Sequence, residues 1–412
     1  MATVEQLRGS LADGDIRSAV ESDAVDGVTP SAVVTPPDPE SVADVVRETY
    51  SERLTIVPRG AGTKLDWGCP PSTVDLVVDV SRLDAVLEHA AGDLVVRVQP
   101  GVRLTALADA LAPAGQRLAI DEVVPGSTVG GVICTGLSGP SRLLYGPVRD
   151  LLIGITVIRA DGTVTRSGGK VVKNVAGYDL GKLYTGSYGT LGLVTEAIFR
   201  LHPLPERAAW VTVELPDEEA LRVRAAAVLD SQVVPSAIEV NRDRPDAPLT
   251  LALLLEGVAA GVDARSETVE RLLGATATTR DEQPAWWATL PGATTVKISV
   301  PIAEVANVIR AVGEAAARIG LTAQTRGSAG VGTLYVGLPA ECDPPDVGRF
   351  VDAVRASCKS AGGTAVILRA PSQVRSAVDP WGPVEGLALM HRIKQQFDPE
   401  GRLSPGRFVG GI

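Results

Sequence analysis

Short alternating apolar runs and helical patterns organise the second half of the chain. Between residues 208 and 370 the order strand, helix, strand, strand, helix occurs twice, and one further strand follows. Apolar side chains at every second position predict strands, and apolar side chains three and four residues apart predict helices that pack through one face. The expected strands cover 210–215, 237–241, 249–256, 295–300, 321–326, 333–338 and 364–368, and the expected helices cover 217–230, 263–273, 302–319 and 345–360. This doubled βαββα order predicts one antiparallel sheet with all its helices on one face, so that the other face is free to cover a site.

The first 205 residues also alternate strands with helices. Residues 41–53 repeat apolar side chains at helical spacing behind Ser41, a candidate N-cap. The stretch "LLIGITVIRADGTVTRSGG" predicts a hairpin with its turn at Asp161-Gly162. Two prolines close this region, so the fold class is α+β. The expected segments are a first domain over 1–206, an α+β lid domain over 207–375 and a C-terminal segment over 376–412.

Length and charge exclude several classes of protein. A chain of 412 residues predicts two or three domains. The net charge of −10 argues against nucleic acid and against an anionic membrane surface, because both favour a basic face. The N-terminus lacks the apolar core of a signal peptide, and Glu256 interrupts the longest apolar run. We therefore expect neither export by that route nor insertion into a membrane.

Cysteines and histidines are too few and too scattered to build a metal centre. They are Cys69, Cys134, Cys342, Cys358, His89, His202 and His391. No C-x-x-C pair occurs, so the spacing gives neither a disulfide framework nor an iron–sulfur or zinc site. We expect no metal, and redox chemistry would have to come from an organic cofactor.

The stretch "IVPRGAGTKLDWG", residues 56–68, ends a β-branched run in a glycine-rich bend flanked by positive charge. It lacks the strand-to-helix spacing of a Rossmann fingerprint, and no Walker A motif occurs, so a bound phosphate would lie against backbone N–H groups of a loop. A tight surface turn explains this stretch equally well on its own. Three further glycine-rich segments, 126–131, 136–146 and 186–192, favour the phosphate, because so much close backbone contact suits a large ligand with a pyrophosphate and a planar ring.

Five segments together resemble the FAD-binding domain of the vanillyl-alcohol oxidase/p-cresol methylhydroxylase (PCMH-type) family. They are "VTPPDPESVADVV", "VPRGAGTK", "PGSTVGG", "GPSRLLYGPVRDLLIGITVIRADGTV" and "KNVAGYDLGKLYTGSYGTLGLVTE". The stretch "SGGKVVKNVAGYDLGKLYTGSYGTLG" is most similar to the FAD-binding subunits of glycolate oxidase-like enzymes. The closing "FDPEGRLSPGR" resembles the segment that in this family folds back onto the flavin domain. The resemblance implies a PCMH-type FAD-binding domain of two subdomains, and it reaches the lid domain only through element order and position.

The resemblance also implies which residues contact FAD. The loop that cradles the pyrophosphate would comprise Arg59, Gly60, Ala61, Gly62, Thr63 and Lys64. The adenosine and pyrophosphate side would be lined by Pro125, Gly126, Ser127, Thr128, Val129, Gly130 and Gly131. The segment that runs towards the ring would contribute Gly136, Ser138, Gly139, Arg142, Tyr145 and Gly146. The isoalloxazine or ribityl end would contact Lys173, Asn174, Tyr178 and Asp179, and the adenine pocket would contain Gly189, Thr190, Gly192 and Val194.

The chain departs from this family at two places. Covalent members attach the flavin through a histidine in the first loop, where this chain has Thr63, so we expect non-covalent FAD. The related D-lactate and D-2-hydroxyacid dehydrogenases carry clustered histidines around a metal, and this chain has none. A hydroxy-acid substrate would then depend on charged residues of the lid strands. The candidates are Arg326, preferred as the clamp for a carboxylate, then Lys297, with Glu239 and Arg369 also available. Because strand side chains alternate between faces, each has an even chance of facing solvent.

Together these features predict an FAD-dependent oxidoreductase that removes two electrons from a 2-hydroxy acid resembling glycolate or D-lactate. The chain would be the FAD-binding subunit of a multi-subunit dehydrogenase, with a second flavin subunit and an iron–sulfur subunit as partners, because it has no second redox centre to accept electrons from the flavin. We expect it to be cytoplasmic, or peripheral to a membrane through those partners. A non-catalytic FAD-binding partner subunit is the first alternative, and an NAD(P)H-dependent reductase of enolpyruvyl sugars on the same fold is the second.

Overall fold

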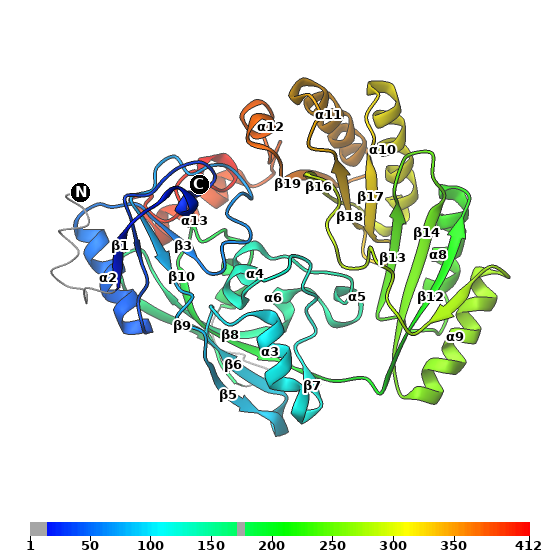
Figure 1. The fold of residues 1–412 in the computed structure, drawn as a ribbon, viewed down its shortest axis with the longest axis horizontal. Coiled ribbons are helices and arrows are strands. Elements are labelled where there is room, and N and C mark those ends of the chain that lie inside the picture. Colours follow the sequence, from blue (N-terminus) through cyan, green and yellow to red (C-terminus); the bar gives the residue numbers. More distant parts are fainter. Residues whose placement is uncertain (1–14, 171–177) are drawn as a thin grey trace. The chain divides into compact units, whose positions relative to one another are not determined.

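The computed structural model of the protein describes residues 15–170 and 178–412. The chain divides into two compact units (Figure 1). Unit 1 comprises Met1–Ser138, Pro147–Leu204 and Val384–Ile412, and unit 2 comprises Gly139–Gly146 and Pro205–Pro383. The segment Gly139–Gly146 therefore belongs to unit 2, although it lies inside the sequence of the first expected domain. The domain boundaries expected from the sequence stay a prediction.

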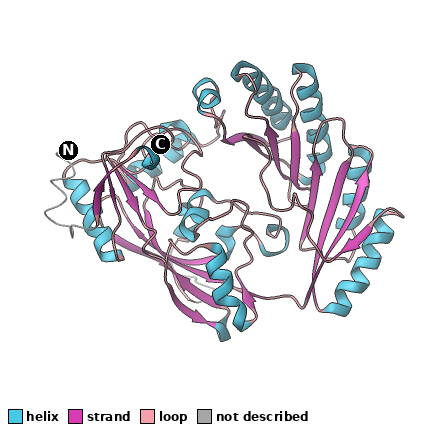
Figure 2. Ribbon diagram, in the orientation of Figure 1, coloured by secondary structure: helices cyan, strands magenta, loops and turns pink. Residues whose placement is uncertain are grey.

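Unit 2 is an antiparallel sheet with helices on one face (Figures 1 and 2). Its strands are β12 (Arg207–Leu215), β13 (Ala237–Arg242), β14 (Leu249–Gly257), β15 (Thr278–Arg280), β16 (Thr294–Ser299), β17 (Gln324–Ser328), β18 (Thr333–Leu338) and β19 (Thr364–Arg369). Its helices are α5 (Arg142–Tyr145), α8 (Glu218–Leu229), α9 (Ala259–Leu273), α10 (Val305–Ile319), α11 (Pro344–Ser360) and α12 (Ser372–Ala377). The strand order across the sheet is β15-β12-β14-β13-β17-β18-β16-β19. The predicted α+β fold with a doubled βαββα order is confirmed.

The two repeats meet at their second strands. Each repeat places its third strand between its first and second strands, as β12-β14-β13 and as β16-β18-β17. Strands β13 and β17 then pair at the centre, with Val240 opposite Gly327. The internal repeat in the sequence is thus also a repeat in strand order.

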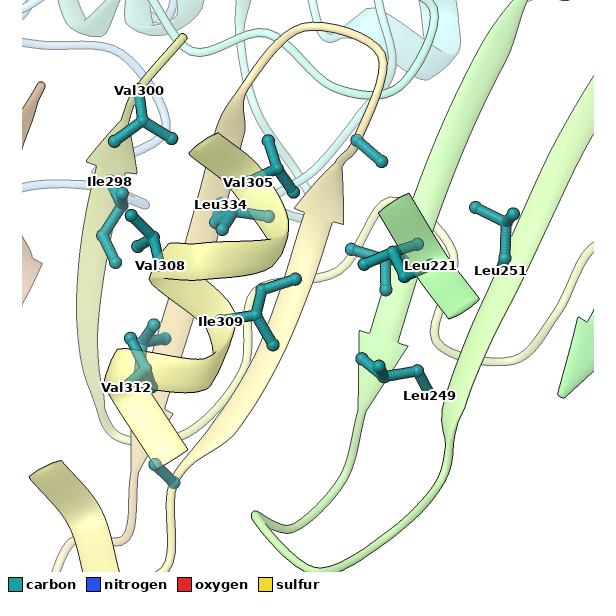
Figure 3. Close-up of a cluster of buried hydrophobic side chains, with 14 of the residues drawn as sticks. Leu221, Leu249, Leu251, Ile298, Val300, Val305, Val308, Ile309, Val312 and Leu334 are labelled. Carbon is teal, nitrogen blue, oxygen red and sulfur yellow. The ribbon is translucent and has the colours of Figure 1, made fainter. Parts of the chain in front are cut away.

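Apolar side chains close the helix-covered face of this sheet (Figure 3). Val308, Ile309 and Val312 of α10 belong to the same buried cluster as Ile298 of β16 and Leu334 of β18. Each fully buried side chain of this size contributes about 1.5–3 kcal/mol relative to an exposed one. Charged side chains of the strands must therefore collect on the opposite face, which we call the helix-free face.

The structure differs from the predicted elements of unit 2 in small ways. Helix α9 begins at Ala259 instead of 263. Val258 is its N-cap, and the small residues 259–261 form its first turn. Strand β15 was not predicted, because this short edge strand, "TTR", is polar and has no apolar alternation. The helix expected over 302–319 is a short 3-10 turn over Ile302–Glu304 followed by α10.

In its described residues, unit 1 contains two larger sheets, each with its own buried cluster, and one two-stranded sheet. The first has the order β1-β2-β4-β3 and consists of β1 (Ile16–Ser18), β2 (Ala32–Val34), β3 (Ile56–Arg59) and β4 (Leu76–Asp79). The second has the order β5-β6-β10-β8-β9 and consists of β5 (Val86–Ala90), β6 (Val95–Val98), β8 (Leu152–Ile158), β9 (Val164–Gly168) and β10 (Leu193–Arg200). A third, two-stranded sheet pairs β7 (Gln116–Arg117) with β11 (His202–Pro203). The helices are α2 (Pro39–Ser51), α3 (Leu104–Leu111), α4 (Val129–Thr135), α6 (Val148–Leu151), α7 (Leu180–Tyr184) and α13 (Leu387–Phe397).

Of two local features predicted in unit 1, the structure contains the hairpin but not the helix N-cap. The hairpin at Asp161-Gly162 is present as β8 and β9, and Gly162 has a φ of +79°. The expected N-cap Ser41 is wrong, because helix α2 begins earlier and its N-cap is Asp38. The Asp38 carboxylate accepts a hydrogen bond from the N–H of Ser41 at 2.8 Å.

The C-terminal segment completes unit 1. Nζ of Lys394 donates to the Asp398 carboxylate at 2.6 Å and to the carbonyls of Thr190 and Leu403. The N–H of Ile56 donates to the carbonyl of Arg402 at 2.9 Å, so the segment extends the edge of β3. It thereby holds the strand from which the first glycine-rich loop departs. Across the described residues, no helix is both long and apolar enough to cross a membrane.

Candidate functional site

A pocket forms in unit 1 where strand β3 ends. The loop after β3 faces the start of helix α4, whose N-cap Thr128 accepts a hydrogen bond from the N–H of Gly131 at 3.3 Å. The pocket is lined by Val57, Pro58, Arg59, Gly60, Ala61, Gly62, Thr63, Lys64, Leu65, Thr128, Gly131, Cys134, Thr135, Tyr188 and Arg407. A second pocket shares several of these residues and adds Val80, Pro100, Gly130, Gly189 and Val194.

Glycines allow the loop and α4 to approach each other. A Cβ atom on Gly60 would lie 2.4 Å from Oγ1 of Thr128, and one on Gly130 would lie 2.7 Å from Cβ of Pro100. Gly62 differs, because a Cβ there would meet its neighbours at ordinary contact distances, while its φ of +74° favours glycine. Space therefore requires Gly60 and Gly130, and backbone conformation requires Gly62.

The loop presents a row of backbone donors to the pocket. Within the described residues, the N–H groups of Gly60, Ala61, Gly62 and Thr63 have no protein acceptor. Successive N–H groups in such a bend form an anion-binding nest. These donors suit the negatively charged oxygens of a diphosphate, which is the part of FAD that the sequence predicted for this loop.

Lys64 supplies a positive charge beside these donors. It is buried, and its Nζ donates to Oγ of Ser127 at 2.6 Å and to Oγ1 of Thr63 at 3.0 Å. Burial lowers the pKa of Lys64 to about 8, against the opposing influence of Glu122 and Cys134. No carboxylate in the described part of the chain forms an ion pair with this ammonium group. A bound anion would therefore complete its surroundings.

Arg59 is held differently from Lys64. Its guanidinium pairs with Asp23 at 2.8 Å and with Asp79 at 2.7 Å, and 13% of its side chain is exposed. Asp23 also pairs with Arg17, and these hydrogen bonds hold the pKa of Asp23 well below its usual range. The charge of Arg59 is thus already matched by two carboxylates, and its side chain fixes the start of the loop.

The structure brings many of the expected FAD-binding residues together. Those that line the two pockets are Arg59, Gly60, Ala61, Gly62, Thr63, Lys64, Thr128, Gly130, Gly131, Gly189 and Val194. Those that adjoin them in the chain without lining either pocket are Pro125, Gly126, Ser127, Val129, Thr190 and Gly192. Sequence reasoning missed Cys134, Tyr188 and Arg407. Tyr188 lies inside "TGSYGTLG" and Arg407 inside "SPGR", so both were within motifs that had been noticed.

The remaining expected residues lie elsewhere. Gly136 ends helix α4 with a φ of +63°, and Oγ of Ser138 accepts a hydrogen bond from the N–H of Val148. Tyr178 is 92% exposed, and Asp179 is exposed at the start of α7. Gly139, Arg142, Tyr145 and Gly146 belong to unit 2. Lys173 and Asn174 lie outside the described residues.

The helix-free face of unit 2 gathers the charged residues predicted on the lid strands. Strand pairing places Lys297 opposite Tyr335, Tyr335 opposite Arg326, and Arg326 opposite Asn241, which makes one row across four strands. In the adjacent row, Thr333 is opposite Ser328, and Ser328 is opposite Glu239. Arg369 pairs with Thr295, two residues from Lys297. Residues in such positions share one face of a sheet, so all four predicted lid residues lie on the same side.

Burial changes the proton affinity of this face. Burial, and to a smaller extent the positive charge of Arg142, together lower the pKa of Lys297 to about 8. Burial raises the pKa of Tyr335 to about 12, so the phenol is protonated at neutral pH. Arg326 is more occupied: its Nη1 donates to Oγ1 of Thr289 at 2.5 Å and its Nη2 lies 3.8 Å from Asp243.

Comparison with known proteins relates the chain to flavin enzymes. A model of the FAD binding domain matches residues 30–168, and a model of the C-terminal domain of FAD linked oxidases matches residues 380–408. The chain is 28% identical over 417 residues to glycolate oxidase subunit GlcD of Bacillus subtilis. This match covers 92% of this chain and 88% of that protein. It is also 34% identical over 184 residues to glycolate oxidase subunit GlcE of Escherichia coli, in a match that covers 44% of this chain and 52% of that protein.

The solved structures confirm the fold. p-Cresol methylhydroxylase superposes with a TM-score of 0.72 and 18% identity, over 98% of this chain and 96% of that chain. The predicted PCMH-type fold and the predicted cofactor FAD are confirmed by these comparisons.

Proposed function

We propose that this FAD-linked oxidoreductase, a homologue of glycolate oxidase subunits, removes two electrons from a 2-hydroxy acid. One observation carries the proposal: Lys297, Arg326 and Glu239, chosen from the sequence as candidates for substrate chemistry, lie in adjacent rows on one face of the unit 2 sheet. That face lies opposite the one that α8, α9, α10 and α11 cover. Two relatives are subunits of glycolate oxidase, which supports the same class of substrate.

The reaction requires two functions from the chain's own residues, substrate binding and proton acceptance. Bound FAD supplies an acceptor for the hydride that leaves C2 of the substrate. The chain must hold the substrate carboxylate and must accept the proton of the 2-hydroxyl group as the C–O bond becomes a carbonyl. Lys297 and Arg326 offer cations for the carboxylate. Lys297, with its lowered pKa, and Glu239 are the candidates for the proton acceptor.

We further propose that the chain works as the FAD-binding subunit of a larger dehydrogenase, with a second flavin subunit and an iron–sulfur subunit. GlcD and GlcE, the two relatives from Bacillus subtilis and Escherichia coli, are both subunits of glycolate oxidase, which supports this arrangement. The sequence has only four cysteines with no C-x-x-C pair, so an iron–sulfur acceptor would have to come from another chain. Purification from native extract under mild conditions should recover such subunits with this chain. A homodimer that turns over with a soluble dye would contradict the multi-subunit proposal.

Anaerobic spectroscopy of the purified holoprotein tests the reaction. Glycolate, D-lactate or D-2-hydroxyglutarate should bleach the flavin absorbance, and NADPH should not. If no hydroxy acid bleaches the flavin in the chain alone or in the assembled complex, the non-catalytic partner is the correct alternative. Bleaching by NADPH alone would favour the enolpyruvyl-sugar reductase.

A further inference from the structure

The helix-free face contains a second cation beside Lys297. Nη1 of Arg142 lies 3.4 Å from Oγ1 of Thr333. Thr333 belongs to the row of residues next to the row that contains Lys297 and Tyr335. The positive charge of Arg142 also contributes to the low pKa of Lys297, so the two cations lie within interaction range. Neither forms an ion pair with a carboxylate among the residues that the structure describes.

Arg142 reaches this face through an anchored segment. It begins the short helix α5, which packs against strand β13. The side chain of Leu143 packs closely against Gly330, where an added Cβ would lie 2.9 Å from Cδ2 of Leu143. At the C-terminal end of α5, the hydroxyl of Tyr145 donates to the Glu256 carboxylate at 3.3 Å. These contacts hold the guanidinium against the sheet, so its place beside Lys297 is built into the fold.

Two neighbouring cations without a counter-ion are unfavourable in a protein interior. Their repulsion grows as water is removed, and each loses hydration. Elsewhere in the protein, the buried Lys394 resolves the same problem with the carboxylate of Asp398 at 2.6 Å. Among the described residues neither Lys297 nor Arg142 forms such an ion pair, so a ligand that brings a negative charge, or deprotonation of Lys297, would relieve their repulsion.

We propose that Arg142 and Lys297 together form the binding site for the carboxylate of a small organic acid. This assignment deepens the proposed function, on which it rests for the substrate class, and moves Arg142 from the cofactor to the substrate. It also replaces Arg326 as the first choice of clamp, because Arg326 is already bonded to Thr289 and lies near Asp243.

The charges of this site suit an anion. Positive charge on this face comes from Arg142, Lys297, Arg326 and Arg369, and the buried Glu239 supplies a negative charge. Asp243 lies 3.8 Å from Arg326 and partly matches its charge. The face therefore keeps a net positive charge, which a carboxylate would reduce. The hydroxyl of Thr333 and the protonated phenol of Tyr335 add neutral hydrogen-bonding groups beside it.

Calorimetric binding of oxamate to the full-length holoprotein tests the site. Oxamate is a monocarboxylate of the size of a short hydroxy acid and cannot give up a hydride. We expect the native protein to bind it, and Arg142→Gln and Lys297→Met each to weaken binding by about tenfold or more, because each removes a charge-assisted hydrogen bond. Lys297→Arg should retain much of the affinity. Arg318→Gln, which removes an exposed charge from the end of helix α10, is the matched control and should bind oxamate normally.

Thermal unfolding gives a readout independent of turnover. At neutral pH without ligand, Lys297→Met should melt at or above the temperature of the native protein, because it removes a half-buried cation that forms no ion pair among the described residues. Oxamate should raise the melting temperature of the native protein but not of this variant. A Lys297→Met protein that melts well below the native protein would overturn the assignment, because it would show that Lys297 has a stabilising partner within the fold.

The outcomes separate this site from the proposed reaction. If oxamate binds and both variants lose it, but hydroxy acids never reduce the flavin, the site stands and the proposed reaction fails. If hydroxy acids reduce the flavin equally fast in Arg142→Gln and in the native protein, the reaction stands and the site is wrong. Failure of the native protein to bind oxamate, glycolate or D-lactate would also overturn the site.

Discussion

The two candidate sites of this protein are built in opposite ways. In unit 1 the pocket is made by main chain: consecutive N–H groups at 60–63, glycines that let α4 approach, and one lysine. In unit 2 the helix-free face is made by side chains from strands far apart in the sequence, aligned by register. A backbone site suits a ligand that never changes, such as a cofactor phosphate. A side-chain site can be altered residue by residue, which suits a substrate that differs among relatives.

Three lysines extend the comparison, of which Lys64 and Lys394 are buried and Lys297 is half-buried. Lys394 is paired with Asp398 and two carbonyls, and it holds the C-terminal segment in place. Within the described part of the chain, Lys64 donates to the hydroxyl groups of Thr63 and Ser127, and Lys297 has Arg142 as a charged neighbour. A lysine satisfied by the protein is structural, whereas the two left without a carboxylate each stand at a site proposed for an anion.

The largest expected effect is loss of FAD from Gly60→Val. The added side chain would meet Thr128, because even its Cβ would lie 2.4 Å from Oγ1. We expect the variant to purify without bound flavin, measured as the ratio of absorbance at 450 and 280 nm. Gly62→Ala should keep partial occupancy, because it costs only the strain of a positive φ, about 1 kcal/mol. Gly92→Ala, where a Cβ would meet nothing within 4 Å, is the control. A yellow Gly60→Val protein at full occupancy would show that the loop is misassigned.

Next in size is the destabilisation caused by Arg59→Met. Removing this guanidinium leaves Asp23 and Asp79 without their shared partner, which costs about 3 kcal/mol for a buried pair. Urea unfolding of the FAD-free protein should show this loss directly. Because the pKa of Asp23 is lowered in the folded state, its contribution to stability is present above the usual carboxylate pKa and is lost as pH falls below it. The native protein should therefore lose more stability in acid than the variant does.

The smallest effect concerns Lys64 and depends on pH. A diphosphate favours the charged form, so FAD binding should draw a proton onto Lys64 once the pH exceeds its pKa of about 8. The Kd for FAD should be flat below that pH and should rise above it by up to tenfold per pH unit, while Lys64→Met should bind more weakly with no such dependence. Fluorescence titration of the FAD-free protein from pH 6.5 to about 9.5 measures this. Equal pH profiles in both proteins would mean that Lys64 does not sense the phosphate. Lys64→Arg should keep affinity at high pH.

The sequence predicted different parts of the molecule with unequal success, for physical reasons. Most strands of unit 2 were placed closely because apolar side chains alternate along them, whereas the strand expected over 321–326 lies at Gln324–Ser328 and the polar edge strand β15 left no such signal. The glycine-rich loop 59–64 could be recognised because Gly60 and Gly62 lie in one short stretch of sequence. The partnership of Arg142 with Lys297 could not, because it depends on the segment 139–146 packing on unit 2 and on a register that pairs Lys297 with Tyr335. Arg59 was expected to add charge for the ligand, but Asp23 and Asp79 are distant in sequence and became visible only in the fold.

The central claim is that the bound flavin takes a hydride from C2 of a 2-hydroxy acid. Anaerobic stopped-flow reduction of the holoprotein, or of the native complex, by D-lactate carrying hydrogen or deuterium at C2 tests it most directly. We predict that the flavin is fully reduced by one equivalent, and that the deuterated substrate reduces it several-fold more slowly, because the C2–H bond breaks in the step observed. Equal rates with the two isotopes would contradict a C2–H cleavage that limits reduction, and a flavin left oxidised by every hydroxy acid in the intact complex would contradict the account itself.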